Sequence, residues 1–136
     1  MTIRAATADD LAAIAAIQAL SPEASQWDPT SYLSYQCLVA MDGTRVIGFL
    51  AARQIAADER EILNLAVDPG ERRRGVARKL LETELQRAKN QWFLEVRASN
   101  FCAIKLYESA GFRVAGRREK YYRHPVDTGI VMKFDS

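Results

Sequence analysis

The feature that most constrains this chain is an apolar segment followed by a turn, a basic glycine-containing loop and a helix. Residues Glu61–Val67 are rich in aliphatic side chains and are typical of a strand, and Pro69-Gly70 marks the turn after it. Leucines then recur at helical spacing, which predicts a helix from about Gly75 to Ala88. The next apolar run, Trp92–Val96, is typical of a buried parallel strand that follows a crossover helix. We therefore expect a strand, a crossover helix and a second strand parallel to the first.

The part of the chain before this unit is expected to contain two helical segments and a hairpin. Thr7 is a good N-cap for a helix with apolar residues at positions 11, 14, 17 and 20, and Ser21-Pro22 would end that helix. A second helical segment would begin at Asp28-Pro29. Its inward-facing side chains would be Tyr32, Leu33 and Tyr35. The expected strands are Thr2–Ala5, Cys37–Met41 and Arg45–Ala52, with a hairpin turn at Asp42-Gly43-Thr44.

The C-terminal part is expected to add a helix and two strands. Ser99 or Asn100 would cap the helix, with Ala103, Ile104 and Tyr107 facing inward, and Gly111 would end it. The final strands would be Phe112–Ala115 and Gly129–Phe134. In the expected helix from about Gly75 to Ala88, Leu80, Leu81 and Leu85 would share the face that packs on the sheet, and Lys79, Glu82, Glu84 and Arg87 would occupy the other faces. The order of elements predicts an α/β chain with a mixed sheet and helices on its faces, forming one domain over residues 1–136.

Composition excludes several classes of function. The chain has 136 residues with 19 basic and 17 acidic side chains, and the formal charge of +2 does not suit a general nucleic-acid coat protein. Cys37 and Cys102 lack a CxxC spacing and His124 is the single histidine, so neither a disulfide framework nor a metal site is expected. His124 is assigned no catalytic role. The sequence contains no signal peptide and no apolar run long enough to span a membrane, which predicts a soluble, cytoplasmic protein.

The basic loop at residues 72–75 suits an anion, because a helix N-terminus presents unpaired backbone N–H groups and arginines flank it. Gly70 and Gly75 have the spacing of a P-loop. A P-loop continues with lysine and a hydroxyl residue, whereas Gly75 is followed by Val76-Ala77. The glycines of a dinucleotide fingerprint are also missing. The remaining interpretation is a loop that binds a pyrophosphate without lysine or metal, or a solvated surface turn.

The pattern Arg72-x-x-Gly75-x-Ala77 resembles the acetyl-coenzyme A signature [Arg/Gln]-x-x-Gly-x-[Gly/Ala] of the GNAT-type N-acetyltransferases. The segment Asn64–Pro69 looks like that family's fourth strand and its exit. The segments Leu94–Asn100 and Ala103–Phe112 are similar to the RimI-type enzymes, which acetylate the N-terminal alanine of a small-subunit ribosomal protein. The resemblance is strong from Glu61 to Phe112 and weak before Trp27. It implies the GNAT fold, with a mostly antiparallel twisted sheet and helices on both faces.

The resemblance also implies acetyl-coenzyme A (acetyl-CoA) as co-substrate and assigns residues to it. The backbone of Leu65, Ala66 and Val67 would pair with the pantetheine arm. The pyrophosphate would be held by the loop and the first turn of the helix, namely Arg72, Arg73, Arg74, Gly75, Val76, Ala77 and Arg78. Asn100 would reach the cofactor from a helix N-terminus, and its alternative role is that of a plain N-cap.

Two side chains are candidates for the chemistry. Glu95 lies within an apolar strand, where partial burial would raise its pKa, and it matches the family's base. The alternative is that Glu95 faces solvent or pairs with Arg97 or Arg118. Tyr107 matches the family's acid, and a protonated phenol can protonate a departing thiolate; the alternative is a core aromatic residue. A backbone N–H of Leu65–Val67 would stabilise the oxyanion.

The acceptor implied by the resemblance is the N-terminal α-amine of a protein, and no nucleic-acid or membrane partner is expected. Acceptors that remain open are a small-molecule amine, a polyamine and an internal lysine; a non-catalytic cofactor- or RNA-binding module is a further alternative. Trp27, Tyr32, Tyr121 and Tyr122 would line a peptide groove or pack in the core. Arg117, Arg118, Lys120 and Arg123 would form a solvated face of a hairpin. The chain departs from the RimI type in the short connection Arg87–Gln91 and in Asp127-Thr128, where those enzymes have an acidic-alanine pair.

Overall fold

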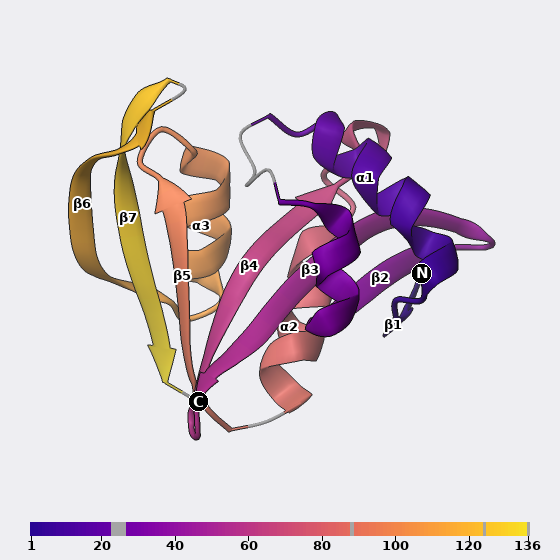
Figure 1. Ribbon diagram of the computed structural model, residues 1–136, viewed down its shortest axis with the longest axis horizontal. Coiled ribbons are helices and arrows are strands. Elements are labelled where there is room, and N and C mark those ends of the chain that lie inside the picture. The colour runs from indigo at the N-terminus through magenta and orange to yellow at the C-terminus, as the bar shows by residue number, and fades with distance from the viewer. Residues whose placement is uncertain (23–26, 88, 124, 136) are drawn as a thin grey trace.

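Seven strands form one sheet in the computed structural model, which describes residues 1–22, 27–87, 89–123 and 125–135 (Figure 1). The strands are β1 (Thr2–Ala5), β2 (Gln36–Asp42), β3 (Arg45–Ala56), β4 (Glu59–Val67), β5 (Gln91–Arg97), β6 (Arg113–Arg123) and β7 (Val126–Asp135). Their order in the sheet is β1-β2-β3-β4-β5-β7-β6. Strands β4 and β5 are parallel, and the other neighbouring pairs are antiparallel. This arrangement confirms the predicted mixed, mostly antiparallel sheet.

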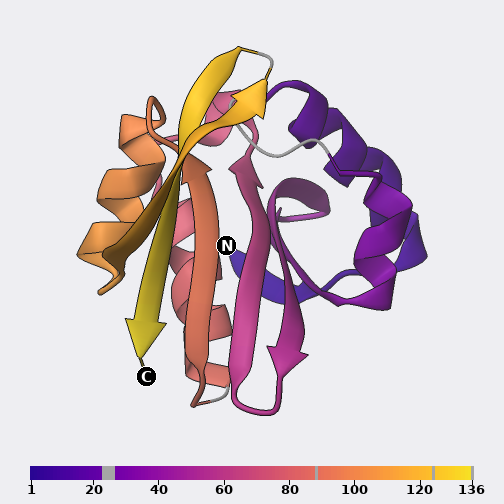
Figure 2. The same cartoon turned by 60° about the vertical axis from the view of Figure 1, so that its left-hand side comes forward.

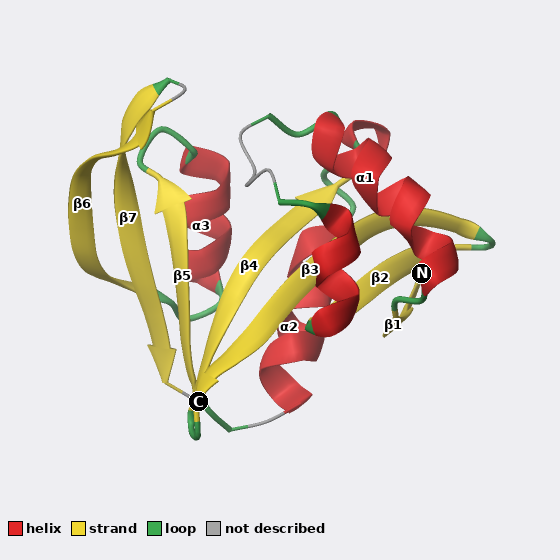
Figure 3. Ribbon diagram, in the orientation of Figure 1, coloured by secondary structure: helices red, strands yellow, loops and turns green. Residues whose placement is uncertain are grey.

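Helices cover both faces of the sheet (Figure 3). The α-helices are α1 (Leu11–Ala19), α2 (Val76–Arg87) and α3 (Phe101–Ser109), and the 3-10 helices are η1 (Ala8–Asp10), η2 (Pro29–Ser34) and η3 (Pro69–Glu71). One core cluster joins α1 and η2 to the sheet, and the other joins α2 and α3 to the opposite face. Within the described ranges, no helix combines the length and the apolarity needed to cross a membrane.

Burial on both faces explains why the central strands are so apolar. In β3, Phe49 and Ala51 belong to the cluster under α1, whereas Leu50 and Ala52 belong to the cluster under α2. A strand buried on both faces reads as a continuous apolar run because successive side chains point to opposite faces. In β5, Trp92, Leu94 and Val96 are buried towards α2 and α3. The alternate residues Phe93, Glu95 and Arg97 are only partly buried, so the other face of this strand remains accessible.

The parallel pair β4 and β5 is joined along only part of its length. Pairing extends from Glu59 opposite Gln91 to Ile62 opposite Leu94. Beyond these residues the two strands diverge, as Figures 1 and 2 show from two directions. Backbone groups on the facing edges of the diverging segments therefore cannot bond to each other, and those without another partner can pair with a bound molecule.

The final hairpin is longer than the sequence predicts. The expected strands Phe112–Ala115 and Gly129–Phe134 are instead β6, Arg113–Arg123, and β7, Val126–Asp135. Strand β6 is an edge strand with mostly exposed residues, and its pairing is interrupted between Val114 and Gly116 and between Arg118 and Tyr122. An exposed edge rich in charge lacks the apolar alternation on which strand prediction depends.

Three predicted side-chain positions are wrong. Leu33 and Tyr35 are exposed, because the segment from Pro29 is a 3-10 helix that directs only Tyr32 into the core. Glu84 is fully buried, because it lies three and four residues after Leu81 and Leu80 on the same face of α2. Its carboxylate accepts a hydrogen bond from Arg87 at 3.2 Å, and burial raises its pKa.

We expect Leu80→Ala to lower the free energy of unfolding by about 2–5 kcal/mol, because Leu80 is 0% exposed and its removal leaves a cavity between α2 and the sheet. Urea denaturation followed by circular dichroism would measure the change.

The matched control is Leu33→Ala, which removes the same atoms from a residue that is 42% exposed and should change stability by less than about 0.5 kcal/mol. Equal losses for the two variants would contradict the packing described here.

Candidate active site

A cavity of about 1040 Å³ lies between the diverging ends of β4 and β5. Its walls also include the loop before α2, the first turns of α2 and α3, and residues from β6. Of the predicted site residues, it is lined by Leu65, Ala66, Val67, Arg72, Arg73, Gly75, Val76, Ala77, Arg78, Glu95, Asn100 and Tyr107. Residues distant in the sequence are thus brought to one cavity. Arg74 is the predicted residue that does not line it.

The loop before α2 has an unusual backbone path. Arg73 and Gly75 both have left-handed φ angles, 69° and 75°. An added Cβ at Gly75 would meet no atom within 4 Å, so the glycine is required by the backbone angle and not by space. A tight path with left-handed residues at a helix N-terminus is typical of backbone anion sites.

Ion pairs hold this loop in place. Arg74 pairs with Asp42 at 3.2 Å and with Glu71. Arg45 pairs with Asp68 and Glu71, each at 2.9 Å. Arg74 therefore anchors the loop to the hairpin between β2 and β3 in the structure, and its side chain is not positioned with the other predicted phosphate contacts.

Strand β4 presents alternate backbone groups to the cavity. The Asp68 N–H donates to the Ile47 carbonyl of β3 at 2.8 Å. Antiparallel pairing alternates, so the backbone of Ala66 also faces β3, whereas the backbone groups of Leu65 and Val67 face the diverging edge. The Leu65 N–H donates to the side chain of the preceding Asn64 at 3.0 Å.

A buried polar network under the cavity was not predicted from the sequence. The Tyr32 hydroxyl donates to Gln18 Oε1 at 2.6 Å, and Asn64 Nδ2 lies 3.1 Å from both Gln18 Oε1 and the Tyr32 hydroxyl. Gln18 Nε2 donates to the Trp27 carbonyl at 2.5 Å. Burial raises the pKa of Tyr32 to about 12. The network joins α1, η2 and β4, and its one signal in the sequence is an asparagine within an apolar strand.

Glu95 lies at the edge of the cavity with its two oxygens in different surroundings. Its side chain is 19% exposed, and Oε1 is 3.5 Å from Nε of Arg118. Oε2 is buried, and the described residues give it no hydrogen-bond partner. Burial raises the pKa of Glu95, the Arg118 cation lowers it, and Glu61 raises it. Of the two alternative partners, Arg118 is the one found; Arg97 stacks on Tyr122 at 4.3 Å.

Tyr107 is both a core residue and part of the cavity wall. It is 7% exposed and meets the ring of Phe112 edge to face at 5.7 Å between centroids. Burial raises the pKa of its phenol, so the hydroxyl stays protonated at neutral pH. This position is compatible with both predicted roles of Tyr107, as a proton donor and as a core aromatic residue.

Asn100 caps α3, because its side chain accepts a hydrogen bond from the Ala103 N–H at 3.3 Å. The choice between Ser99 and Asn100 as cap is thereby decided. Glu61, a second carboxylate that sequence reasoning did not select, also lines the cavity and pairs with Arg53 at 2.8 Å.

The aromatic and basic side chains divide into two groups. Trp27, Tyr121 and Tyr122 line the cavity, whereas Tyr32 belongs to the buried network below it. Arg117, Lys120 and Arg123 are exposed on β6, as a solvated hairpin face requires. Arg118 differs from them because it pairs with Glu95. His124 lies outside the described residues.

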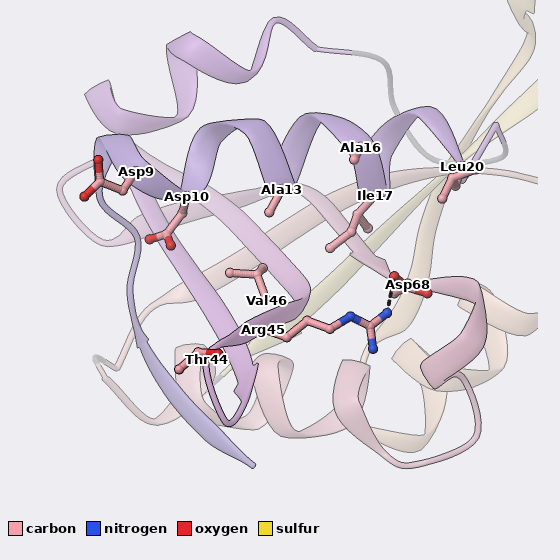
Figure 4. A pocket seen from close by; sticks show the side chains of 10 residues that line it. All are labelled: Asp9, Asp10, Ala13, Ala16, Ile17, Leu20, Thr44, Arg45, Val46 and Asp68. Carbon is pink, nitrogen blue, oxygen red and sulfur yellow. Dashed lines mark hydrogen bonds and ion pairs between the residues drawn. The ribbon is translucent and has the colours of Figure 1, made fainter.

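A second cavity, of about 420 Å³, lies between α1 and the hairpin of β2 and β3 (Figure 4). Figure 4 shows the Arg45 guanidinium directed to Asp68, so the principal cation of this cavity is already paired. In the described part of the chain, no three or more His, Cys, Asp or Glu side chains gather as a metal site would need. The cavity between β4 and β5 is therefore the candidate active site.

Residues 8–112 match the model of the acetyltransferase (GNAT) family. The chain belongs to the GNAT family. The match covers β4, the basic loop, α2, β5 and α3, which supply most of the cavity wall; Tyr121 and Tyr122 of β6 lie beyond it. The family resemblance deduced from the Arg72–Ala77 pattern is confirmed.

Within the family, the chain is similar to ribosomal-protein alanine N-acetyltransferases. The chain is 49% identical over 76 residues to the [ribosomal protein bS18]-alanine N-acetyltransferase of Escherichia coli strain K12. The matched segment is 53% of this chain and 51% of that relative, so the chain spans about half the length of the relative. The crystal structure of the ribosomal-protein-S18-alanine N-acetyltransferase from Escherichia coli matches 98% of this chain and 92% of that one, with 33% identity and a TM-score of 0.81. A GNAT acetyltransferase from Elizabethkingia anophelis, solved with acetyl-CoA bound, shares the fold with a TM-score of 0.77 at 20% identity, over 99% of this chain and 97% of that one.

We expect Tyr32→Phe to destabilise the protein by about 1–3 kcal/mol, because it removes one donor and one acceptor from the buried network. Reorientation of Asn64 would also shift the amide resonance of Leu65, which donates to that side chain. Thermal unfolding and amide NMR would measure the two effects.

Tyr35→Phe is the matched control, since Tyr35 is exposed and lies outside the network; it should leave both quantities nearly unchanged. If the Leu65 amide resonance in Tyr32→Phe had the same chemical shift as in the wild type, the network would not position β4.

Proposed function

We propose that the protein is an N-acetyltransferase that moves an acetyl group from acetyl-CoA to a primary amine, most favourably the N-terminal α-amine of a protein that begins with alanine. One observation carries the proposal: a single cavity is lined by the basic loop before α2, by Glu95 and Tyr107, and by Trp27, Tyr121 and Tyr122. The unit that acts is the single domain of residues 1–136.

The residues that line the cavity suit acetyl-CoA. The loop and first helical turn would hold the pyrophosphate through backbone N–H groups and the side chains of Arg72, Arg73 and Arg78. Leu65 and Val67 would offer their outward backbone groups to the pantetheine amides, and Ala66 would contribute packing surface. Asn100 would add a contact from the start of α3 while it caps the helix. Arg74 keeps the loop in position for these contacts.

Acetyl-CoA supplies an activated acetyl thioester, and the protein supplies proton transfer and charge stabilisation. Glu95 would accept a proton from the acceptor amine as the nitrogen bonds to the acetyl carbon, directly or through one water. A backbone N–H of Leu65–Val67 would stabilise the negative oxygen, and the Val67 N–H is favoured because that of Leu65 already donates to Asn64. Tyr107 would then donate its proton to the departing thiolate as the carbon–sulfur bond breaks.

An α-amine suits this catalytic pair. Its pKa is about 8, so roughly a tenth is neutral at pH 7, whereas a lysine amine with a pKa near 10.4 is almost fully protonated. A carboxylate whose pKa is raised mainly by partial burial is a modest base, and a modest base is enough for an α-amine. The likeness to ribosomal-protein alanine N-acetyltransferases further supports a ribosomal protein as the acceptor, which would place the activity in the cytoplasm. The proposal includes no nucleic-acid or membrane partner.

We expect a short peptide with a free N-terminal alanine to be acetylated at least tenfold faster than the same peptide with a blocked N-terminus and an internal lysine, because far less of the lysine amine is neutral at pH 7. Release of free thiol from acetyl-CoA would measure the rate, and mass spectrometry would locate the acetyl group.

A polyamine and a small aromatic amine would be assayed in parallel. Faster turnover of either, or of the internal lysine, would replace the proposed acceptor while keeping the transferase. No transfer to any amine, despite binding of acetyl-CoA, would favour a non-catalytic module.

We expect Glu95→Gln and Tyr107→Phe each to lower kcat by about 10²–10⁴-fold, because each keeps the shape of the side chain and removes the proton acceptor or donor. Calorimetric titration with acetyl-CoA should give an unchanged Kd, which separates chemistry from cofactor binding.

Matched controls are Glu108→Gln and Tyr35→Phe, which make the same chemical changes at exposed positions and should retain wild-type kcat. Full activity of Tyr107→Phe would remove that residue from the mechanism.

A further inference from the structure

Gly129 of β7 lies directly against the Glu95 carboxylate. Gly129 is buried, and it pairs with Arg97 of β5 on one side and with Arg118 of β6 on the other. A Cβ added at Gly129 would lie 2.7 Å from Glu95 Oε2 and 3.2 Å from the ring of Tyr121. A contact of 2.7 Å is closer than side chains allow, so any residue larger than glycine would exclude the carboxylate from its observed position.

The backbone does not explain this glycine. The left-handed glycines of the described residues are Gly43, Gly75 and Gly111, and Gly129 is not among them. Its backbone conformation is one that an ordinary residue adopts, and a glycine within a strand weakens the strand. The feature that requires glycine here is therefore the space that its missing side chain leaves.

We propose that Gly129 is a positioning residue for Glu95: its missing side chain forms a recess on β7 that receives the carboxylate, and Arg118 closes this recess from β6. The inference rests on the proposed function, in which Glu95 is the base. It assigns roles to two residues of the last hairpin that the Arg72–Ala77 pattern and the Glu95 segment do not reveal.

The recess explains the unequal surroundings of the two carboxylate oxygens. Oε2 lies over Gly129, where it is buried and has no hydrogen-bond partner among the described residues. Oε1 lies 3.5 Å from Nε of Arg118, and the Arg118 guanidinium is itself stacked at 5.1 Å from the centre of the Tyr121 ring. Oε2 is thus shielded from solvent, whereas Oε1 lies beside the Arg118 side chain, which is 58% exposed.

Charged and titratable groups face Glu95 from three sides. They are Glu61 of β4, Arg97 of β5 itself, and Arg118, Tyr121 and Tyr122 of β6. Strand β7 contributes Lys133, which pairs with Phe93, two residues before Glu95, and lies over the Phe93 ring. Burial is the largest influence on the pKa of Glu95 and raises it, whereas Arg118 is the cation that lowers it. Filling the recess, which moves the carboxylate out towards solvent, and removing the Arg118 cation should therefore shift the pKa of Glu95 in opposite directions.

The experiment compares Gly129→Ala with Arg118→Gln in the full chain. The methyl group of Gly129→Ala meets the far end of a flexible side chain, so Glu95 can rotate away without unfolding the strand. Arg118 is largely exposed, so its replacement should also leave the fold intact. Thermal unfolding would verify both variants. Carbon-13 NMR of glutamate-labelled protein, with the Glu95 carboxyl assigned by comparison with Glu95→Gln, would follow its titration without any need for turnover.

We expect the titration midpoint of Glu95 to fall by about one pH unit in Gly129→Ala and to rise by a similar amount in Arg118→Gln. The acid limb of the pH profile of kcat/KM, measured with acetyl-CoA and an alanine-first peptide, should move in the same directions. In Gly129→Ala, kcat should also fall by about tenfold to a hundredfold, because the base has left its position. Arg118→Lys, which keeps the cation, should restore most of the wild-type midpoint.

Gly116→Ala is the matched control, because an added Cβ at Gly116 of β6 meets nothing within 4 Å, and it should shift neither titration nor profile. The proposal would be overturned if the Glu95 titration midpoint in Gly129→Ala equalled that of the wild type. It would also be overturned if the midpoints of Gly129→Ala and Arg118→Gln moved in the same direction. Absence of acetyl transfer by the wild type would reject the proposed function alone, since the NMR titration would still decide whether Gly129 positions Glu95.

Discussion

The divergence of β4 and β5 is the constraint on which the rest of the structure depends. The two strands pair only up to Ile62 and Leu94, and their free ends form the walls of the largest cavity described. A sheet interrupted in this way would lose core contacts unless other elements bridged it. Helices α2 and α3 do so by packing into one cluster that contains Leu80, Trp92 and Tyr107. The cavity is thus lined both by residues of α2 and α3 and by Ser21, Pro22 and Trp27 from the N-terminal part of the chain.

Polar contacts hold the two sides of this opening in place. On the β4 side, Gln18, Tyr32 and Asn64 form a buried network, and Asn64 also binds the Leu65 N–H. On the β5 side, Ser99 donates to Asp127 at 2.6 Å, which attaches the last hairpin to the start of α3. The Gln18–Tyr32–Asn64 network is buried, and buried polar groups cost free energy unless they are paired, so it fixes one arrangement more strictly than apolar packing does. The Ser99–Asp127 hydrogen bond is exposed. The cavity walls are therefore positioned from both sides by directional bonds.

The sequence predicted the elements that repeat a simple pattern and missed those that depend on distant neighbours. Apolar runs and helical spacing locate β4, α2 and β5 to within a few residues, and Asn100 is one of the two predicted caps. The pattern predicts too short a strand at β6, because its charged, exposed residues carry no apolar alternation. Glu84 was placed on a polar face because its charge outweighed its spacing from Leu80 and Leu81. The loop around Gly75 was found through a pattern, whereas Arg74, inside that pattern, is turned away by Asp42 and Glu71.

The surroundings of Glu95 show why a residue that matches a family motif does not by itself determine its own pKa. Its position in β5 follows from the sequence, but its burial comes from Gly129 of β7 and its ion pair from Arg118 of β6. These contacts are made across strands whose register no local pattern specifies, and β6 itself has two irregularities near this point. Burial favours the protonated carboxyl and Arg118 favours the carboxylate, so the pKa of Glu95 reflects a balance between groups on two neighbouring strands. Substitutions in the hairpin can therefore alter this balance while Glu95 itself remains unchanged.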